Sequence, residues 1–332
     1  MAAKRLAPLQ LPRRFPQEAP PSADTSNGCE AQSLAPCRFI HGGNALSAQP
    51  TQPITPSEIV AVADELGASG GGAGSSRLIA LLFDDSVDAT EIVRCLQAEP
   101  ALAARVLKVA NSAYYRRGGY IGTFEQALVV LGLSGVRGIA AVGCMDRIRV
   151  PSVGRLLDAE RFRCHSIAVA TAAQSLSQSA GAGVDAEAFM AGLIHDIGLV
   201  ILARLRPQEV GTLSRLDADE TAILQAEIDL LGIDHPSASA LLAEAWHLPN
   251  WLCLALRSHP SPETGRRLTG TEALPALLAV GDACAAQAGY RVWVPHSSIS
   301  IAPWAAVLGL HDDVCREVVA RLPDAVGRLT SR

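Results

Sequence analysis

The sequence contains very little lysine. Only Lys4 and Lys108 are lysines among the 28 basic residues of the 332-residue chain, so the other 26 (28 − 2) are arginines. A phosphate-binding loop of the Walker type carries a lysine directly after its glycine-rich turn, and neither lysine lies beside the glycine-rich stretch 68–76. The sequence therefore excludes a P-loop nucleotide hydrolase, and we interpret 68–76 as a linker.

Aromatic and charged side chains are also scarce. Aromatic residues make up 4% of the chain, too few for the stacking platform on which proteins bind single-stranded nucleic acid. Charged residues make up 18% and the net charge is −5, the opposite of the basic balance of a DNA-binding protein, so we expect no direct DNA binding. The hydrophobic residues, at 49%, suffice for a large core.

The eight cysteines form no CxxC pair and lie far apart, mostly within apolar stretches. This distribution is typical of reduced, buried thiols and not of a disulfide framework or a zinc knuckle. It predicts a cytoplasmic protein. The cysteines are Cys29, Cys37, Cys95, Cys144, Cys164, Cys253, Cys284 and Cys315.

We expect neither a secretory signal nor a membrane-spanning segment. The first residues are basic, but no apolar stretch follows them. The longest weakly polar stretch, 127–143, is interrupted by Arg137 and several glycines and is shorter than the ~20 residues that span a bilayer. We predict two buried helices in this stretch.

The composition divides the chain into four parts. Residues 1–54 are rich in proline, glutamine, serine, alanine and glycine without helical or strand periodicity, which predicts a flexible tail. Residues 55–84 form an N-terminal helical segment that contains the glycine-rich linker. We expect the main helical domain at 85–290 and a C-terminal helical extension at 291–332.

Helical spacing and helix-ending residues dominate the chain after residue 54 and predict an all-α fold. Residues 55–57 open a helix that Gly67 ends. Asp88 has the position of an N-cap, and Thr123 and Gln126 have the spacing of a capping box. The sequence contains no hairpin dipeptide and no sustained period-2 alternation, so we predict no strand. Further helices are predicted at 89–98, 100–111, 158–180, 185–204, 220–231, 236–246, 249–258, 272–288 and 312–329.

His195 and Asp196 stand side by side within the otherwise apolar segment FMAGLIHDIGLVIL. Burying an imidazole next to a carboxylate costs several kcal/mol unless a partner compensates both groups. A divalent metal is one such partner, and an arginine or a helix N-terminus is another. The dipeptide alone favours neither alternative.

Four further residues favour the metal. His165 has apolar neighbours at helical spacing and Asp282 is a lone charge on an apolar helix, while His235 begins one predicted helix and His259 ends another. These residues and the His195–Asp196 pair offer six nitrogen or oxygen donors that converge if the helices form a bundle. Such a mixed set suits iron, manganese or zinc, or magnesium where carboxylates dominate.

Each of these residues also has a purely structural explanation. A single buried histidine or aspartate is usually satisfied by a cap or a bridging hydrogen bond. His235 could cap the helix after it, and His259 could lie on a helix C-terminal dipole. We assign His247, beside Trp246, to packing. The remaining histidines, His41, His296 and His311, have no supporting sequence context.

The order of His165, His195-Asp196 and Asp282 resembles the metal-dependent phosphohydrolase superfamily named for its His-Asp pair. A more specific resemblance, over about 85–285, is to the HDOD family, the HD-related output domain of bacterial signalling proteins. Residues 96–139 resemble its first helical part, and AFMAGLIHDIGLVIL with residues 230–260 resembles its second. The matching positions are Asn111, Ser112, Ala113, Thr123, Ala127, Leu131, Gly132, Gly232, Asp234, His235, Ala240, Trp246, Leu248, Pro249 and His259.

The resemblance implies two packed helical lobes and a role in signal transduction. HDOD domains commonly lack the metal ligands of the superfamily and are regarded as non-enzymatic, whereas this chain keeps all six candidate residues. The chain also departs from the related cyclic-di-GMP phosphodiesterases of the HD-GYP group. Leu199 replaces their lysine, Ser258-His259 replaces their double histidine, and 257–270 contains no GYP element.

Two functional hypotheses follow. In the first, the chain is a bacterial regulatory protein without enzymatic activity that acts through contacts with a protein partner, and its His-Asp cluster is either structural or a site for a divalent metal. In the second, it is a metal-dependent phosphohydrolase acting on a nucleotide or cyclic dinucleotide. The second assigns metal ligation to His165, His195, Asp196 and Asp282, and a second ion or the substrate phosphate to His235 and His259.

Overall fold

The computed structural model describes residues 52–68, 74–84, 86–112, 115, 120–153, 157–216, 218–262, 265–292 and 302–330. Most residues in these ranges are helical, and the only β-structure within them is an isolated bridge between Val153 and Leu157. This confirms the predicted all-α class. Of the predicted tail 1–54, only Gln52–Ile54 fall within these ranges.

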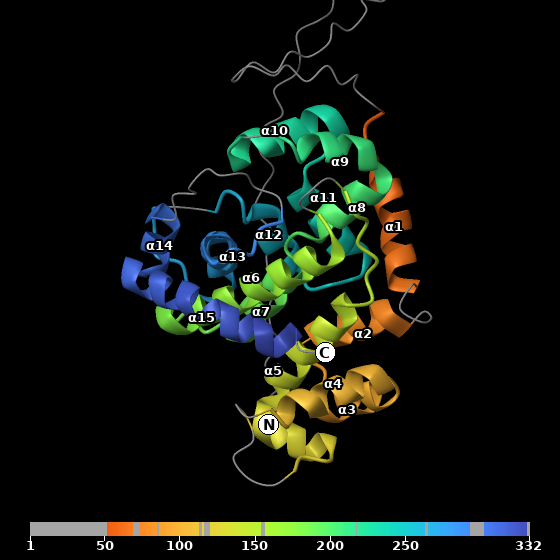
Figure 1. Cartoon of the computed structure of the whole chain (residues 1–332), viewed down its shortest axis with the longest axis vertical. Coiled ribbons are helices and arrows are strands. Elements are labelled where there is room, and N and C mark those ends of the chain that lie inside the picture. The colour runs from red at the N-terminus through yellow and green to blue at the C-terminus, as the bar shows by residue number, and fades with distance from the viewer. Residues whose placement is uncertain are drawn as a thin grey trace, which may run out of the picture. The chain divides into compact units, whose positions relative to one another are not determined.

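The helices are drawn in Figure 1. They are α1 (Pro56–Ala68), α2 (Gly74–Phe83), α3 (Ala89–Gln97), α4 (Pro100–Ala110), α5 (Phe124–Met145), α6 (Ala159–Ala180), α7 (Asp185–Ile194), α8 (Ile197–Leu205), α9 (Pro207–Leu213), α10 (Glu220–Leu231), α11 (His235–Ala245), α12 (Asn250–Ser258), the 3₁₀ helix η1 (Gly270–Ala273), α13 (Leu274–Gln287), α14 (Ala302–Leu308) and α15 (Asp312–Thr330).

The predicted caps begin their helices. The Asp88 carboxylate accepts a hydrogen bond from the backbone N–H of Glu91 at the start of α3. Thr123 and Gln126 form the complete capping box of α5. Within α5, the non-helical backbone of Gly132, with φ 70°, divides the segment into two helical stretches. Glycine adopts this left-handed conformation more readily than other residues. The prediction of two helical stretches over 127–143 is therefore confirmed, but only the second is buried, because Val129 and Val130 of the first are exposed.

The structure corrects three predicted elements. Gly67 does not end the first helix, because α1 continues to Ala68. Helix α2 begins at Gly74, within the predicted linker 68–76, and the linker residues 69–73 lie outside the described ranges. The helix predicted at 185–204 is two helices, α7 and α8, which are separated at His195 and Asp196.

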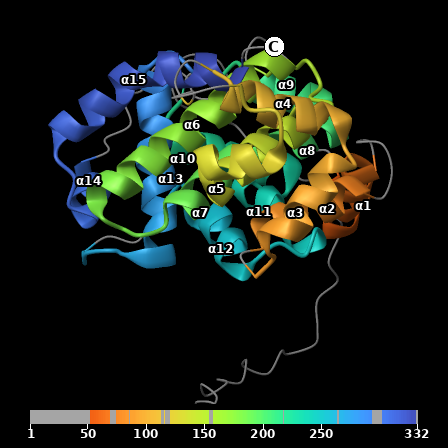
Figure 2. The same cartoon turned by 90° about the horizontal axis from the view of Figure 1, so that it is seen from below.

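Helix α6 lies at the centre of the packing. It contacts α7, α13 and α15, and Figures 1 and 2 both show these helices side by side. Alanines and other small residues from Ala168 to Ala173 line its buried face, which lets its neighbours approach closely. Helix α11 contacts both α8 and α12. The helices that carry the candidate residues thus pack directly against one another.

The N-terminal helix α1 packs on α8 and α11. The indole N–H of Trp246 donates a hydrogen bond to the carbonyl of Ala63 at 3.0 Å. Immediately before α1, Ile54 is buried and its N–H donates to the carbonyl of Leu231 at 2.7 Å. Ile54, the last residue of the predicted tail, thus packs with the helical part of the chain.

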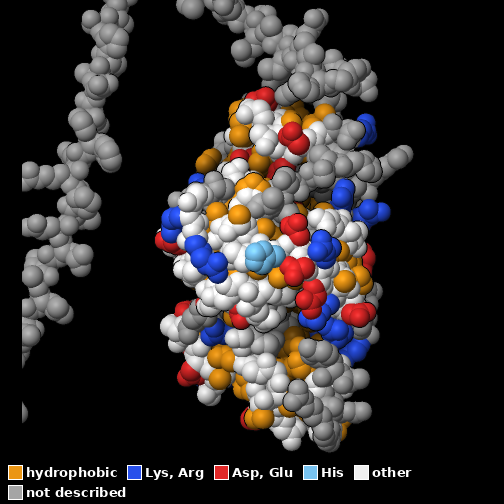
Figure 3. All heavy atoms as spheres, turned by 90° about the vertical axis from the view of Figure 1, so that its left-hand side faces the viewer, with side chains coloured by type: hydrophobic (Ala, Val, Ile, Leu, Met, Phe, Trp, Pro, Cys, Tyr) orange, Lys and Arg blue, Asp and Glu red, His pale blue; other side chains and the backbone are white. Residues whose placement is uncertain are grey.

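Two stretches within the described ranges, Phe124–Met145 and Asp185–Leu205, are long and apolar enough to cross a membrane by length and composition alone. Their most apolar windows are 56% and 89% buried inside the protein, as in core helices. On the face drawn in Figure 3, acidic and basic side chains are interspersed and no broad area carries one sign of charge.

Candidate metal centre

His195 and Asp196 lie at the break between α7 and α8. Adjacent residues of a continuous helix point about 100° apart, so the break allows both side chains to face the same site. The Ser239 hydroxyl of α11 stabilises this break. It donates to the carbonyl of His195 and accepts from the N–H of Gly198, both at 2.8 Å.

Gly198 permits a close approach of α8 to α11. A Cβ atom at this position would collide with the carbonyl oxygen of His235 and with Ser239. The glycine of the HDIG sequence therefore brings His235 on α11 against the His195–Asp196 pair.

All six residues predicted as metal or phosphate ligands come together around the Asp196 carboxylate. They come from α6, the α7–α8 junction, the start of α11, the end of α12 and the middle of α13. The four histidines are 1–5% exposed. The set is His165, His195, Asp196, His235, His259 and Asp282.

The two oxygens of Asp196 face different pairs of histidines. Oδ2 lies 3.3 Å from the Nε2 atoms of His165 and of His195. Oδ1 lies 3.5 Å from Nε2 of His235 and 3.7 Å from Nε2 of His259. The result is two groups of three potential ligands that share Asp196.

Asp282 extends the first of these groups. Its Oδ1 atom lies 3.6 Å from Nε2 of His165, and its side chain is 20% exposed, more than any other member of the cluster. Asp282 thus lies on the more open side of an otherwise buried site.

Every histidine of the cluster is held in place through its outer ring nitrogen, Nδ1. Because these partners are hydrogen-bond acceptors, each ring carries a proton on Nδ1 and directs Nε2 toward Asp196. This is the arrangement in which metal-binding histidines are oriented by surrounding groups. The acceptors are the Tyr290 carbonyl for His165 (3.1 Å), the Gly192 carbonyl for His195 (2.9 Å), the Glu227 carboxylate for His235 (2.9 Å) and the Leu256 carbonyl for His259 (2.7 Å).

The charges of the cluster are strongly coupled. Burial alone would raise the pKa of the Asp196 carboxyl, but the surrounding imidazoles hold this pKa well below its usual range. Burial lowers the pKa of His165 and His235, but their carboxylate neighbours outweigh this effect and raise the two values to about 9 and about 10. Burial together with the neighbouring histidines lowers the pKa of His259 to about 3.

The sequence analysis missed Glu227, which is completely buried on α10. Its carboxylate accepts from the backbone N–H of His235 at 2.8 Å and from Nδ1 at 2.9 Å. A signal was present, because Glu227 falls among Ile223 and Leu230 on the apolar face of the helix predicted at 220–231. A lone acid on such a face needs a buried partner.

A second missed acid, Glu220, begins α10. Burial and the negative charge of Asp282 raise its pKa to about 8.

The structure also corrects the alternative that His235 caps the helix after it, α11. Asp234 is the N-cap, since its carboxylate accepts from the N–H of Ser237 at 2.9 Å.

The remaining histidines do not join the cluster. His247 is exposed at a turn with φ 55°, so its assignment to packing was wrong. His311 is exposed, while His41 and His296 lie outside the described ranges. Leu199, at the position of the HD-GYP lysine, is 1% exposed and packs in the core.

The donor set fits a divalent metal. Four imidazole nitrogens and two carboxylates, directed inward from rigid helices, match the mixed ligands that iron, manganese and zinc prefer. Without a cation, the close approach of Nε2 of His165 to Nε2 of His195, at 3.3 Å, needs a proton between two acceptors. The cluster is therefore a candidate metal centre.

Comparisons with known proteins agree with this architecture. A model of the HDOD domain family matches residues 75–262. The fold is similar to that of a protein from Shewanella amazonensis named "putative phosphohydrolase", with a TM-score of 0.62 and 24% identity, covering 82% of this chain and 96% of that one. It is also similar to a "putative signal transduction protein" from Marinobacter aquaeolei, with a TM-score of 0.60 and 22% identity, covering 81% of this chain and 60% of that one.

A curated relative, an uncharacterised protein from Treponema pallidum, is 26% identical over 200 residues. The match covers 56% of this chain and only 37% of the relative's length. At these levels of identity the solved structures establish a common fold and no common activity.

Proposed function

The chain belongs to the HDOD family, and we propose that it is a metal-binding regulatory protein of bacterial signal transduction that acts through contacts with a protein partner. One observation carries the proposal. Four histidine Nε2 atoms face the two oxygens of a single buried carboxylate, Asp196. Burying this many titratable groups costs free energy, and a regulator that acted through surface contacts alone would not need them.

The residues divide into two metal sites that share Asp196. His165, His195 and Asp282 complete the first site, and His235 and His259 complete the second. A divalent ion bound there would act as a Lewis acid on a phosphoryl oxygen or as a structural crosslink between helices. Which metal binds depends on availability as well as on the ligands.

The protein's own residues prepare the centre before any ion binds. Tyr290, Gly192, Glu227 and Leu256 fix the four imidazoles in one orientation. Glu227 in addition places a negative charge behind His235, which strengthens that histidine as a ligand. Asp196 stays ionised because its pKa is held low.

The environment of Leu199 supports the regulatory role over efficient catalysis. A lysine at this position would contribute a charged hydrogen bond to a substrate phosphate, whereas Leu199 is apolar and buried. This difference favours a centre that stabilises a signalling state.

Elemental analysis tests the metal part of the proposal. Protein purified without chelators should contain near-stoichiometric iron, manganese or zinc, which the double variant His195→Ala/Asp196→Ala should lose. His311→Ala, an exposed histidine outside the cluster, is the matched control and should keep the metal. Metal-free wild-type protein that cannot be loaded with any of these ions would overturn the metal assignment.

A pull-down with the full chain tests the partner part. A specific protein should be recovered at stoichiometric levels with wild-type bait and with His311→Ala. Recovery of no specific partner would count against a role in protein contacts. Because the free cysteines of the described ranges are mostly buried, we propose that this partner is met in the cytoplasm.

A second candidate function is metal-dependent phosphohydrolysis of a nucleotide or cyclic dinucleotide. The specific observation in its favour is the pair of ligand groups sharing one carboxylate, since two adjacent ions suit displacement at phosphorus. Release of phosphate or nucleotide should then require added metal and should vanish in His195→Ala/Asp196→Ala. Absence of release across a nucleotide panel by metal-loaded protein would eliminate this candidate.

A further inference from the structure

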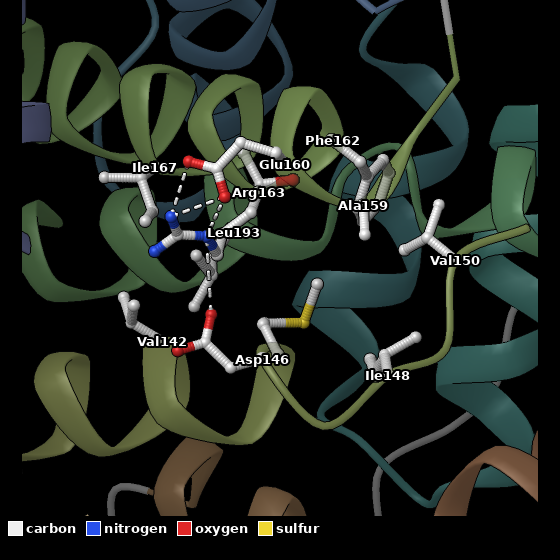
Figure 4. A pocket seen from close by; sticks show the side chains of 12 residues that line it. Val142, Asp146, Ile148, Val150, Ala159, Glu160, Phe162, Arg163, Ile167 and Leu193 are labelled. Carbon is white, nitrogen blue, oxygen red and sulfur yellow. Dashed lines mark hydrogen bonds and ion pairs between the residues drawn. The ribbon is translucent and has the colours of Figure 1, made fainter. Parts of the chain in front are cut away.

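A cavity separate from the metal centre lies between the C-terminal end of α5 and the first turns of α6. Its volume is about 330 Å³, within the range of small-molecule sites. Figure 4 shows Asp146, Glu160 and Arg163 gathered at one end of the cavity, beside the apolar Ile167 and Leu193, and only apolar side chains, Val150 and Phe162 among them, at the other end. No residue of the metal centre lines it.

Arg163 is the central charged group of this cavity. Its guanidinium donates to the Glu160 carboxylate at 2.7 Å and lies 3.7 Å from Asp146. Its side chain is only 14% exposed, whereas that of Glu160 is 61% exposed. An exposed carboxylate contributes little to such a pair, because water competes for it. Glu160 can therefore leave Arg163 more easily than Arg163 can leave the cavity.

Asp146 does not depend on Arg163 alone. The Arg105 guanidinium of α4 forms a short ion pair with the same carboxylate and also donates to the carbonyl of Leu329 at 2.6 Å. If Glu160 moves away, Arg163 keeps only its longer contact with Asp146, a carboxylate that Arg105 also neutralises. An incoming amine, in contrast, would have to displace an arginine from one of the two carboxylates.

Ser166 also contributes a polar atom to this cavity. It lies almost one turn after Arg163 on α6, lines the same cavity and is 1% exposed. Within the part of the chain that the structure describes, its hydroxyl has no hydrogen-bond partner. Buried hydroxyls are normally satisfied, so an unsatisfied one beside a cavity indicates a ligand or water oxygen nearby.

We propose that this cavity binds a small amphipathic anion, such as a medium-chain carboxylate. Its carboxylate replaces Glu160 on Arg163, where the planar guanidinium suits two-point recognition. Its hydrocarbon part lies against the apolar end formed by Ile148, Val150 and Phe162. Arg163 precedes His165 of the metal centre by only two positions on α6.

Calorimetric titration of the full chain with octanoate tests this site. Wild-type protein should bind one equivalent, and Arg163→Gln should weaken binding at least tenfold because the head group loses its partner. Arg94→Gln, an exposed arginine paired with Glu91, is the control and should bind like the wild type. Equal affinity of wild type and Arg163→Gln would overturn the proposal.

Two further titrations separate a specific loss from misfolding. Glu160→Gln removes the competing carboxylate and should bind octanoate more tightly than the wild type, a gain that an unfolded variant cannot show. Val150→Trp should fill the apolar end and abolish binding. Binding of neutral 1-octanol as tight as that of octanoate, or weaker octanoate binding by Glu160→Gln, would contradict recognition by Arg163.

Discussion

Individual side chains determine the chemistry of the centre through their outer contacts. Each histidine has one nitrogen fixed by an acceptor and the other directed at Asp196. Among these acceptors only Glu227 is charged, and it is completely buried. Glu227 therefore has the greatest influence on the basicity of a single ligand, His235.

Replacing Glu227 with glutamine should weaken metal binding by about 10–100-fold while the fold is retained. The amide keeps one acceptor oxygen, but it removes the negative charge behind His235. Competition against a chromogenic chelator measures the affinity. Glu272→Gln changes an exposed glutamate that pairs with Arg266 and serves as the control. Unchanged affinity in Glu227→Gln would show that His235 binds no metal.

Metal binding should release protons near neutral pH. The pKa values of His165 and His235 are raised to about 9 and about 10, so both rings are protonated in the metal-free protein at pH 7.5. Ligation needs their neutral forms, and about two protons should leave per chain. Affinity should consequently rise with pH between 6 and 9.

Titration calorimetry in two buffers with different ionisation enthalpies counts these protons. The observed heat should differ between the buffers by about twice the difference in ionisation enthalpy. Identical heats in both buffers would mean that neither histidine changes protonation when metal binds.

At the residue scale, the sequence predicted the six donors but not the residues that orient them. His195 and Asp196 are conspicuous because they interrupt an apolar segment. Glu227 also interrupts an apolar face, yet its partner lies eight residues away across a turn, which spacing alone does not reveal. The carbonyl acceptors leave no trace in side-chain identity, because every residue carries one.

At the scale of elements, the helix ends that side chains specify were predicted well. Caps at Asp88 and Thr123 act locally, so their residue types are sufficient evidence. The break between α7 and α8 depends instead on Ser239, which is distant in sequence. His195 and Asp196 interrupt the apolar pattern of residues 185–204, but neither is a residue type that ends a helix, so the pattern gave no reason to divide the helix there.

The contact of α8 with α11 should be sensitive to Gly198. In Gly198→Ala the added Cβ meets the carbonyl of His235, so the helices must separate. Overpacking of this kind typically costs about 1–3 kcal/mol. Urea unfolding of metal-free protein measures the loss. Gly327→Ala on α15, where an added Cβ meets nothing within 4 Å, is the control and should be neutral or stabilising. Equal stability of both variants would contradict the close contact.

For the whole molecule, the centre joins helices that are far apart in the sequence. Its ligands come from α6, α11, α12, α13 and the α7–α8 junction. A bound ion would therefore crosslink most of the packed core, in keeping with the proposed role in signal transduction. Helical spacing in the sequence predicted the all-α class, and the HDOD resemblance implied two packed helical lobes, but the positions of α2 and α9 lack comparable motifs.

Metal should stabilise the entire described fold. Binding only to the folded state contributes about 2.7 kcal/mol when free metal is at 100 times its dissociation constant. Thermal unfolding with excess metal should occur at a higher temperature than unfolding with a chelator. The double variant His195→Ala/Asp196→Ala should show no such difference, and an equal shift in that variant would place the stabilising metal elsewhere.

The most direct test of the central claim is the number of metal equivalents bound by each chain. Because Asp196 is shared by both ligand groups, titration of chelator-treated protein should give two equivalents for the wild type. It should give one for His235→Ala/His259→Ala and none for Asp196→Ala. Two equivalents retained by Asp196→Ala, or none bound by the wild type, would contradict a metal centre built around this carboxylate.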